Sequence, residues 1–278
     1  MRVVSLPMCT TLVLFGPRIV YVSIPPRLQQ LFELFVAQHE ARSDDDWHAL
    51  IPSSVTFYSM PLNLPASFSL AAVAWPARLH TLTLHAFPAL TDAQLQYLPP
   101  TLAVLVLEQL QQITTLRLLG CAASLQSLTI VCCDNLRSLH VAMPAVTYFE
   151  AKAVRRLYRW SEYMPRCIIA RLLNCPNAAM PEINCSLEQL LALGVANWSY
   201  QRIFSLPKLR RATLDGHPSC WPRDLVQYMP EGSKIAVRLD DNYSFRKFAT
   251  GPLRTDITLR RSRDAVGLAN RFKPWQNA

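Results

Sequence analysis

Apolar and polar positions alternate in short segments that return every 23 residues along the middle of this chain. The three clearest copies occupy residues 79–84, 102–107 and 125–130, and each reads L-x-x-L-x-L or the same pattern with a final isoleucine. Pro76 and Pro99 precede the first two copies by three residues. Residues that open further copies in similar phase are Pro7, Pro25, Pro52, Pro144, Pro165, Ser186, Pro207, Pro230 and Pro252.

The spacing within each copy predicts a short strand. Alternation over its last three positions places the leucines on one face and the intervening residues on the other. A single turn of this length cannot bury that apolar face by itself, so neighbouring copies are expected to stack into a continuous core with a parallel sheet along one side. Proline fits ahead of each strand, because the first residue of a strand can lack an N–H. Leu82, Leu105 and Leu128 should therefore form one column.

A second ladder of apolar residues lies halfway round each turn. It occupies residues 113–118 and returns at 136–141, with a looser copy at 154–157. Only about eleven residues separate one ladder from the next, so no multi-turn helix fits between them. The expected fold is a β-rich repeat solenoid with parallel strands and few long helices.

These copies resemble leucine-rich repeats, in which L-x-x-L-x-L recurs at a period of about 20–29 residues. The openings Ile-Pro-Ser-Ser-Val-Thr at 51–56 and Leu-Pro-Pro-Thr-Leu at 98–102 are similar to those of FNIP-type repeats, although the Phe-Asn-Ile-Pro core that names the type is absent. Residues 91–98 are similar to the link between repeats of the ribonuclease-inhibitor and F-box type. The resemblance covers about residues 51–260. It implies protein–protein recognition, and no catalytic residue carries over.

Three parts are expected along the chain. Residues 1–50 should form an N-terminal strand or strands and a helical capping region, residues 51–261 the leucine-rich repeat solenoid, and residues 262–278 a basic C-terminal cap or tail. Clustered apolar residues make 27–40 the longest helix candidate, and Ser43 or Asp44 could cap a second short helix. This region is expected to cover the open end of the core. An F-box-like pair of adaptor helices is the alternative.

Arginine dominates the charge of the chain. The formal net charge is +9, which attracts acidic partners of any kind. Tyr158, Trp160 and Tyr163 lie among some of the arginines, an arrangement that could grip phosphates and stack on bases. A solvated flank of the solenoid is the alternative interpretation. The predicted basic patch draws on two clusters along the chain, one with Arg155, Arg156 and Arg159 and the other with Arg260, Arg261 and Arg263.

No motif in the sequence indicates chemistry. Nucleophile elbows, phosphate-binding loops and zinc-protease motifs are absent from it. Cys133 and Asp134 near His140 come closest to a nucleophile and a base, but the ladder places His140 on a different strand face. We therefore expect no enzymatic activity, no cofactor and no metal.

Cysteine usage and hydropathy favour a cytoplasmic protein. The eight cysteines lack zinc-binding spacing. Cys121 and Cys133 fall just past ladder ends, where small apolar residues are buried, so free thiols in a reducing compartment are expected. No uncharged apolar run reaches the roughly 18 residues that suggest a membrane span. We expect no membrane association.

A non-catalytic protein–protein interaction scaffold is the function that these features favour. Its partner, another protein, should be read by the strand positions that face away from the core. Two alternatives are a substrate-selecting subunit or effector of a ubiquitin-type ligase and a basic RNA-associated protein. The second ladder offers a different surface, with Arg117 and His140 in register for an acidic partner. The predicted recognition surface consists of Thr81, Thr83, His85, Val104, Val106, Glu108, Ser127, Thr129 and Val131.

Overall fold

The computed structural model describes the centre of the chain almost continuously and short segments on either side of it. The helix expected after Ser43, the tail at 262–278 and Arg263 lie outside the described residues. The described residues are 4–5, 11–16, 22–23, 30–36, 55–59, 69–87, 90–182, 185–196, 198, 202–203, 206–216, 234–239 and 256–261.

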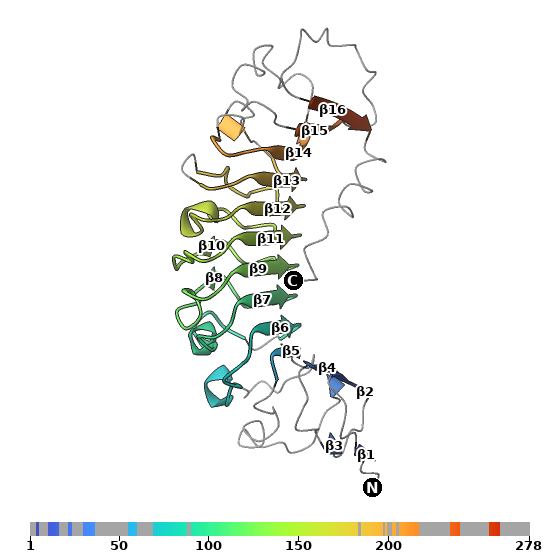
Figure 1. Ribbon diagram of the computed structural model, residues 1–278, viewed down its shortest axis with the longest axis vertical. Coiled ribbons are helices and arrows are strands. Elements are labelled where there is room, and N and C mark those ends of the chain that lie inside the picture. The colour runs from blue at the N-terminus through green and yellow to red at the C-terminus, as the bar shows by residue number, and fades with distance from the viewer. Residues whose placement is uncertain are drawn as a thin grey trace.

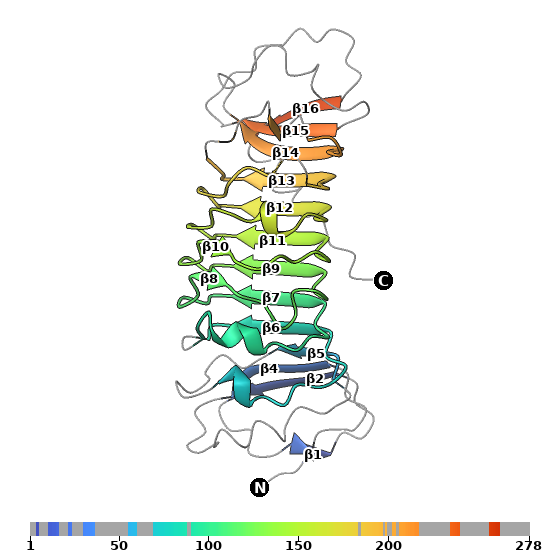
Figure 2. The same cartoon turned by 90° about the vertical axis from the view of Figure 1, so that its left-hand side faces the viewer.

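A long parallel sheet forms one side of a solenoid (Figures 1 and 2). Each of its strands pairs in parallel with the strand of the next turn, as the repeat predicted. Outside it, β1 (Val4–Ser5) pairs with β3 (Val22–Ser23). The strands of the long sheet, in spatial order, are β2 (Thr11–Gly16), β4 (Gln30–Val36), β5 (Phe57–Ser59), β6 (Thr81–His85), β7 (Val104–Glu108), β9 (Ser127–Val131), β11 (Tyr148–Lys152), β12 (Ile169–Leu173), β13 (Gln189–Leu193), β14 (Arg211–Gly216), β15 (Lys234–Leu239) and β16 (Asp256–Arg261).

The core is a set of columns that run from turn to turn. Leu82 pairs in register with Leu105, Leu105 with Leu128, and Leu128 with Phe149. All four side chains are fully buried. The single column predicted for the three leucines is therefore confirmed, and it continues into an aromatic residue one turn later.

The second ladder also forms strands. Strand β8 (Thr115–Leu116) pairs in parallel with β10 (Ser138–Leu139), and Ser138 makes an isolated bridge to Arg159 in the next turn. Leu116 and Leu139 are buried, so both ladders supply the same core. The connections contain the short 3-10 helices η2 (Leu70–Ala72), η3 (Gln94–Tyr97) and η4 (Ser161–Tyr163), and residues 202–203 are also helical.

A left-handed residue follows each of six consecutive strands of the long sheet. In five of the six residues the N–H donates to a carbonyl of the next turn; for example, Ala86 donates to the carbonyl of Glu108 at 2.9 Å and Cys132 to that of Lys152 at 2.8 Å. Such a backbone is unfavourable for residues other than glycine, so the repeated inter-turn bond offsets a repeated local cost. The left-handed residues are Ala86, Gln109, Cys132, Ala153, Asn174 and Gly194, with φ between 47° and 69°.

The helix predicted for residues 27–40 was wrong. Residues Gln30–Val36 form strand β4 between β2 and β5, and Leu31 pairs in register with Tyr58 of the next turn. Short apolar runs fit a strand and a helix equally well by sequence. The neighbouring strand edges decide between them, because a helix would leave the backbone groups of those edges unpaired.

We expect Leu105→Asp to destabilise the solenoid by several kcal/mol, because the carboxylate would be buried without a partner. Val106→Asp is the matched control, since Val106 faces outward and is only partly buried. Urea denaturation followed by circular dichroism measures both. Equal losses for the two variants would contradict the register of β7.

Gly120 is the site of a second stability test. A Cβ atom there would lie 2.8 Å from the carbonyl oxygen of Gln96 and closer still to that of Leu98. Both contacts are backbone atoms of the preceding turn, which cannot rotate away. We expect Gly120→Ala to cost about 1–3 kcal/mol through overpacking, whereas Ala123→Gly at an exposed position should cost less than 1 kcal/mol. A Gly120→Ala protein as stable as the wild type in urea would show that the turns can separate freely.

Candidate recognition surface

Three strands bring the nine predicted surface residues together. Register pairs join Thr83 to Val106 and Val106 to Thr129, with the flanking rows aligned in the same way. In β6, β7 and β9 these outward positions are partly exposed and alternate with buried ones. We call the rows on these three strands the outer strip: Thr81, Val104 and Ser127; Thr83, Val106 and Thr129; and His85, Glu108 and Val131.

The central row of the outer strip is uncharged. Thr83, Val106 and Thr129 are all β-branched, so their side chains have few rotamers to lose on binding. Parallel strands place these side chains about 4.8 Å apart. Along one border, His85 Nδ1 lies 3.0 Å from Glu108 Oε2. The outer strip is thus a rigid, neutral surface with one polar pair at its edge.

A charged cluster closes the outer strip on one side. Glu150 of β11 is in register with Thr129, and Arg171 of β12 is in register with Glu150. Arg171 Nη1 lies 3.4 Å from Glu150 Oε2, with side chains only 11% and 17% exposed. The Tyr148 hydroxyl donates to the same carboxylate. Burial, reinforced by that carboxylate, raises the pKa of Tyr148.

Sequence reasoning missed this cluster. The repeat copy that begins at Pro144 could have indicated part of it. In that copy, Tyr148 and Glu150 occupy the same outward positions as Ser127 and Thr129 one turn earlier. Beyond Arg171 the central row changes again, because Leu191 and Thr213 at the equivalent positions are buried. Among the residues of this row whose exposure the structure describes, the partly exposed and uncharged ones are therefore those on β6, β7 and β9.

The structure does not bring the predicted basic patch together. Arg155, Arg156 and Arg159 follow β11 and are exposed. Arg260 and Arg261 end β16, and β12, β13, β14 and β15 lie between β11 and β16 in the sheet. The arginines therefore belong to separate regions of the surface.

Trp160 is unavailable for stacking on a base. Its indole ring is buried in the core, stacks on Phe149 with ring centroids 5.3 Å apart, and donates from Nε1 to the carbonyl of Ala179 at 2.7 Å. It occupies the leucine position of the second ladder, one turn after Leu139. The predicted aromatic series among the arginines therefore loses its largest member.

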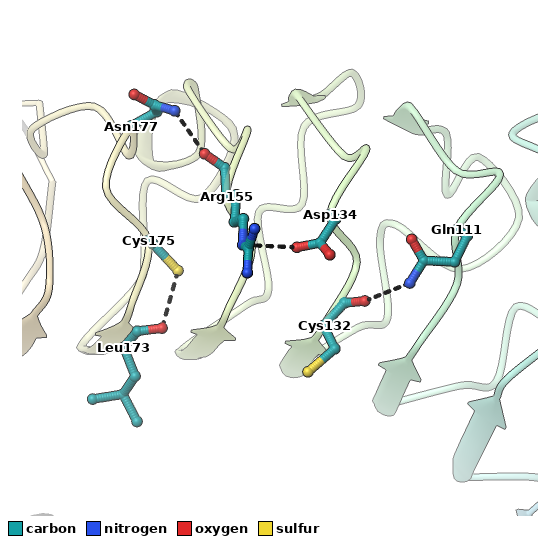
Figure 3. Close-up of polar contacts among 7 residues, drawn as sticks. All are labelled: Gln111, Cys132, Asp134, Arg155, Leu173, Cys175 and Asn177. Carbon is teal, nitrogen blue, oxygen red and sulfur yellow. Dashed lines mark hydrogen bonds and ion pairs between the residues drawn. The ribbon is translucent and has the colours of Figure 1, made fainter.

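Polar side chains link successive turns beside the ends of the strands (Figure 3). Gln111 Nε2 donates to the carbonyl of Cys132 at 3.2 Å, and Asn177 Nδ2 donates to that of Arg155 at 2.7 Å. Between them, Arg155 Nε lies 3.7 Å from Asp134 Oδ1. The two amide side chains satisfy carbonyls that the tight corner removes from the sheet.

The cysteines of the described region are free thiols. Five are buried and Cys132 is partly buried. Burial raises the pKa of Cys133 to about 11 and that of Cys121 to about 12, which keeps both protonated and poorly nucleophilic at neutral pH. His140 is exposed whereas Cys133 is buried, so these two side chains do not form a nucleophile–base pair.

Neither a metal cluster nor a membrane span occurs in the described part of the chain. No group of three or more histidine, cysteine, aspartate or glutamate side chains there could hold a metal ion. No helix there is long and apolar enough to cross a membrane.

Asp92 fixes the start of the second ladder. Its carboxylate accepts from the backbone N–H and the hydroxyl of Thr114, at 2.9 and 2.7 Å, and from the same two groups of Thr115, at 3.1 and 2.7 Å. Burial of the carboxyl acts to raise the pKa of Asp92, but the hydrogen bonds from Thr114 and Thr115 outweigh it and lower that pKa. The ionised carboxylate is the form that holds β8.

Compared with known proteins, the sequence matches no protein-family model and no curated protein.

We expect Asp92→Asn to lower the free energy of unfolding by about 1 kcal/mol at neutral pH, because the amide nitrogen cannot accept from Thr115. The depressed pKa makes this contribution present above the ordinary pKa of aspartate and lost as the pH falls through the pKa of the folded state. The difference between the urea midpoints of the two proteins should therefore persist at the ordinary pKa of aspartate and shrink as the pH falls further below it. A gap that stays constant with pH would contradict a role for the ionised carboxylate.

Proposed function

We propose that this chain is a non-catalytic scaffold of the leucine-rich repeat type that binds another protein on the outer strip. The uncharged central row of Thr83, Val106 and Thr129 is the observation that supports it most. These side chains are partly exposed on a sheet whose register is set by buried leucines on its other face. A partner would meet a surface that needs little ordering before it binds.

The composition of the outer strip suits a protein partner. Val104, Val106 and Val131 contribute apolar area at positions where a partner could exclude water. Threonine and serine hydroxyls among them can donate and accept hydrogen bonds. The border pair of His85 and Glu108 offers polar side chains for specificity at a rim.

The leucine-rich repeat type is supported by the arrangement of the two ladders. The L-x-x-L-x-L leucines are buried, their strands are parallel, and the second ladder adds short strands β8 and β10. The free cysteines of the described region are consistent with a protein that functions in a reducing compartment such as the cytoplasm.

Neither alternative function gains support. The ligase-adaptor hypothesis depended on a helix over residues 27–40, where the chain forms strand β4 instead. The RNA hypothesis depended on aromatic side chains among arginines, and Trp160 is buried. Protein binding remains the function that the described surface supports best.

We expect Val106→Arg to abolish binding while the protein stays folded, because the long charged side chain would be desolvated against the partner. Tagged wild-type and variant proteins would be used to capture partners from a cell extract, followed by quantitative mass spectrometry. Ala123→Arg is the matched control, with the same added charge at an exposed position outside the outer strip. Proteins retained by the wild type and the control in high salt, but lost with Val106→Arg, are the expected result.

Equal capture by Val106→Arg and the wild type would overturn the assignment of the outer strip. Arg117→Glu separates the two sides of the solenoid. If Arg117→Glu loses the partner and Val106→Arg keeps it, the proposed surface is on the wrong side.

A further inference from the structure

A second surface, on the side of the solenoid that carries β8 and β10, has a different character (Figure 1). It is rich in exposed cations. We call the following exposed residues the basic face: Arg117, Leu119, Arg137, His140, Arg156 and Tyr158.

Backbone contacts place Arg117 beside His140, and Arg137 beside Tyr158, in adjacent turns. The N–H of His140 donates to the carbonyl of Leu116 at 3.1 Å, which sets His140 beside Arg117. The N–H of Tyr158 donates to the carbonyl of Arg137 at 2.7 Å. The side chains therefore lie in rows across the turns, as those of the outer strip do on the other side.

Three carboxylates near the basic face already have partners. Asp134 lies 3.7 Å from Arg155, and Glu162 lies 3.8 Å from Arg159. The Asp92 carboxylate accepts from the two threonines at β8.

Three arginines of the basic face are left with their charge uncompensated. Among the described residues, no carboxylate comes within 4.0 Å of the guanidinium groups of Arg117, Arg137 or Arg156. The positive charge of this face is therefore available to a partner.

Two large apolar side chains accompany this charge. Leu119 is 63% exposed and Tyr158 is 60% exposed. Leu119 follows Arg117 by two residues, and Tyr158 lies one turn from Arg137. Cations interspersed with apolar side chains complement a chain that carries the opposite charge and apolar groups of its own.

We propose that the basic face binds an acidic polypeptide segment with interspersed apolar residues. Carboxylates of the segment pair with Arg117, Arg137 and Arg156, and its apolar side chains contact Leu119 and Tyr158. This inference does not depend on the outer strip, which lies on the other side of the core.

The observations favour a polypeptide over a single-stranded nucleic acid. Sequence-tolerant binding of single strands uses several aromatic side chains that stack on successive bases. On the basic face only Tyr158 is an exposed aromatic residue, because Trp160 is buried and Tyr163 is partly buried against the core. One ring cannot provide a stacking platform for a strand.

The test measures fluorescence anisotropy of a labelled peptide of glutamate and leucine added to the full chain. The triple variant Arg117→Gln, Arg137→Gln and Arg156→Gln removes the uncompensated charges. The control variant Arg78→Gln, Arg166→Gln and Arg210→Gln removes the same net charge from exposed positions elsewhere. Circular dichroism confirms that both variants are folded. We expect the triple variant to lose about tenfold or more in affinity and the control to change less than about twofold.

Further probes decide the chemistry of the partner. Peptides of glutamate and serine should bind more weakly than peptides of glutamate and leucine, and the double variant Leu119→Ser and Tyr158→Ser should remove that difference. No detectable binding, or equal loss in the control variant, would overturn the proposal. Tighter binding of oligouridylate of equal charge, lost in the same triple variant, would also overturn it and assign the face to nucleic acid.

Discussion

Burial of apolar side chains between successive turns is the interaction on which this structure depends. A single turn has two apolar ladders and nothing of its own to bury them, so each turn is stable only when it packs against neighbouring turns. The column from Leu82 through Leu105 and Leu128 to Phe149 shows how this is met, since every member is fully buried. Register follows from the same requirement, because a slip by one residue would turn the leucines outward.

Polar contacts add specificity to this stacking. Left-handed corners such as Ala86 and Cys132 extend the backbone ladder one residue past each strand. Asp92 satisfies two backbone donors at the start of β8, and Asn177 satisfies a carbonyl at a corner. Each of these side chains reaches the adjacent turn. The polar groups that the bends release are thus paired between turns, and neighbouring turns are held at a fixed spacing.

A solenoid of this kind has two separate outward surfaces on one core. The leucines of both ladders are buried in the core. The outward residues between them are not constrained by core packing, so they can differ from turn to turn and between the two sides. On the long sheet they are small and neutral around Val106, whereas on the other side they are cationic around Arg137. The two surfaces could therefore serve different partners without competing for the same residues.

The sequence by itself determined the period, the parallel stacking, the register of the leucine columns and the nine outward positions of the outer strip. It could do so because a repeated pattern is read many times over, and only one register buries all its leucines. It failed where the pattern is present once. The apolar run over residues 27–40 suited a helix, and only the adjacent edges of β2 and β5 made part of it a strand.

From the sequence, Trp160 was expected at the surface among arginines. In the structure its side chain is buried in the core, at the position that Leu139 occupies one turn earlier. The cluster of Tyr148, Glu150 and Arg171 joins residues from two turns. Arg171 lies 23 residues after Tyr148 and 21 residues after Glu150 along the chain. Such contacts depend on which side chains face each other after stacking. That information exists only in the tertiary structure, because it comes from the distances between turns rather than from the spacing within one.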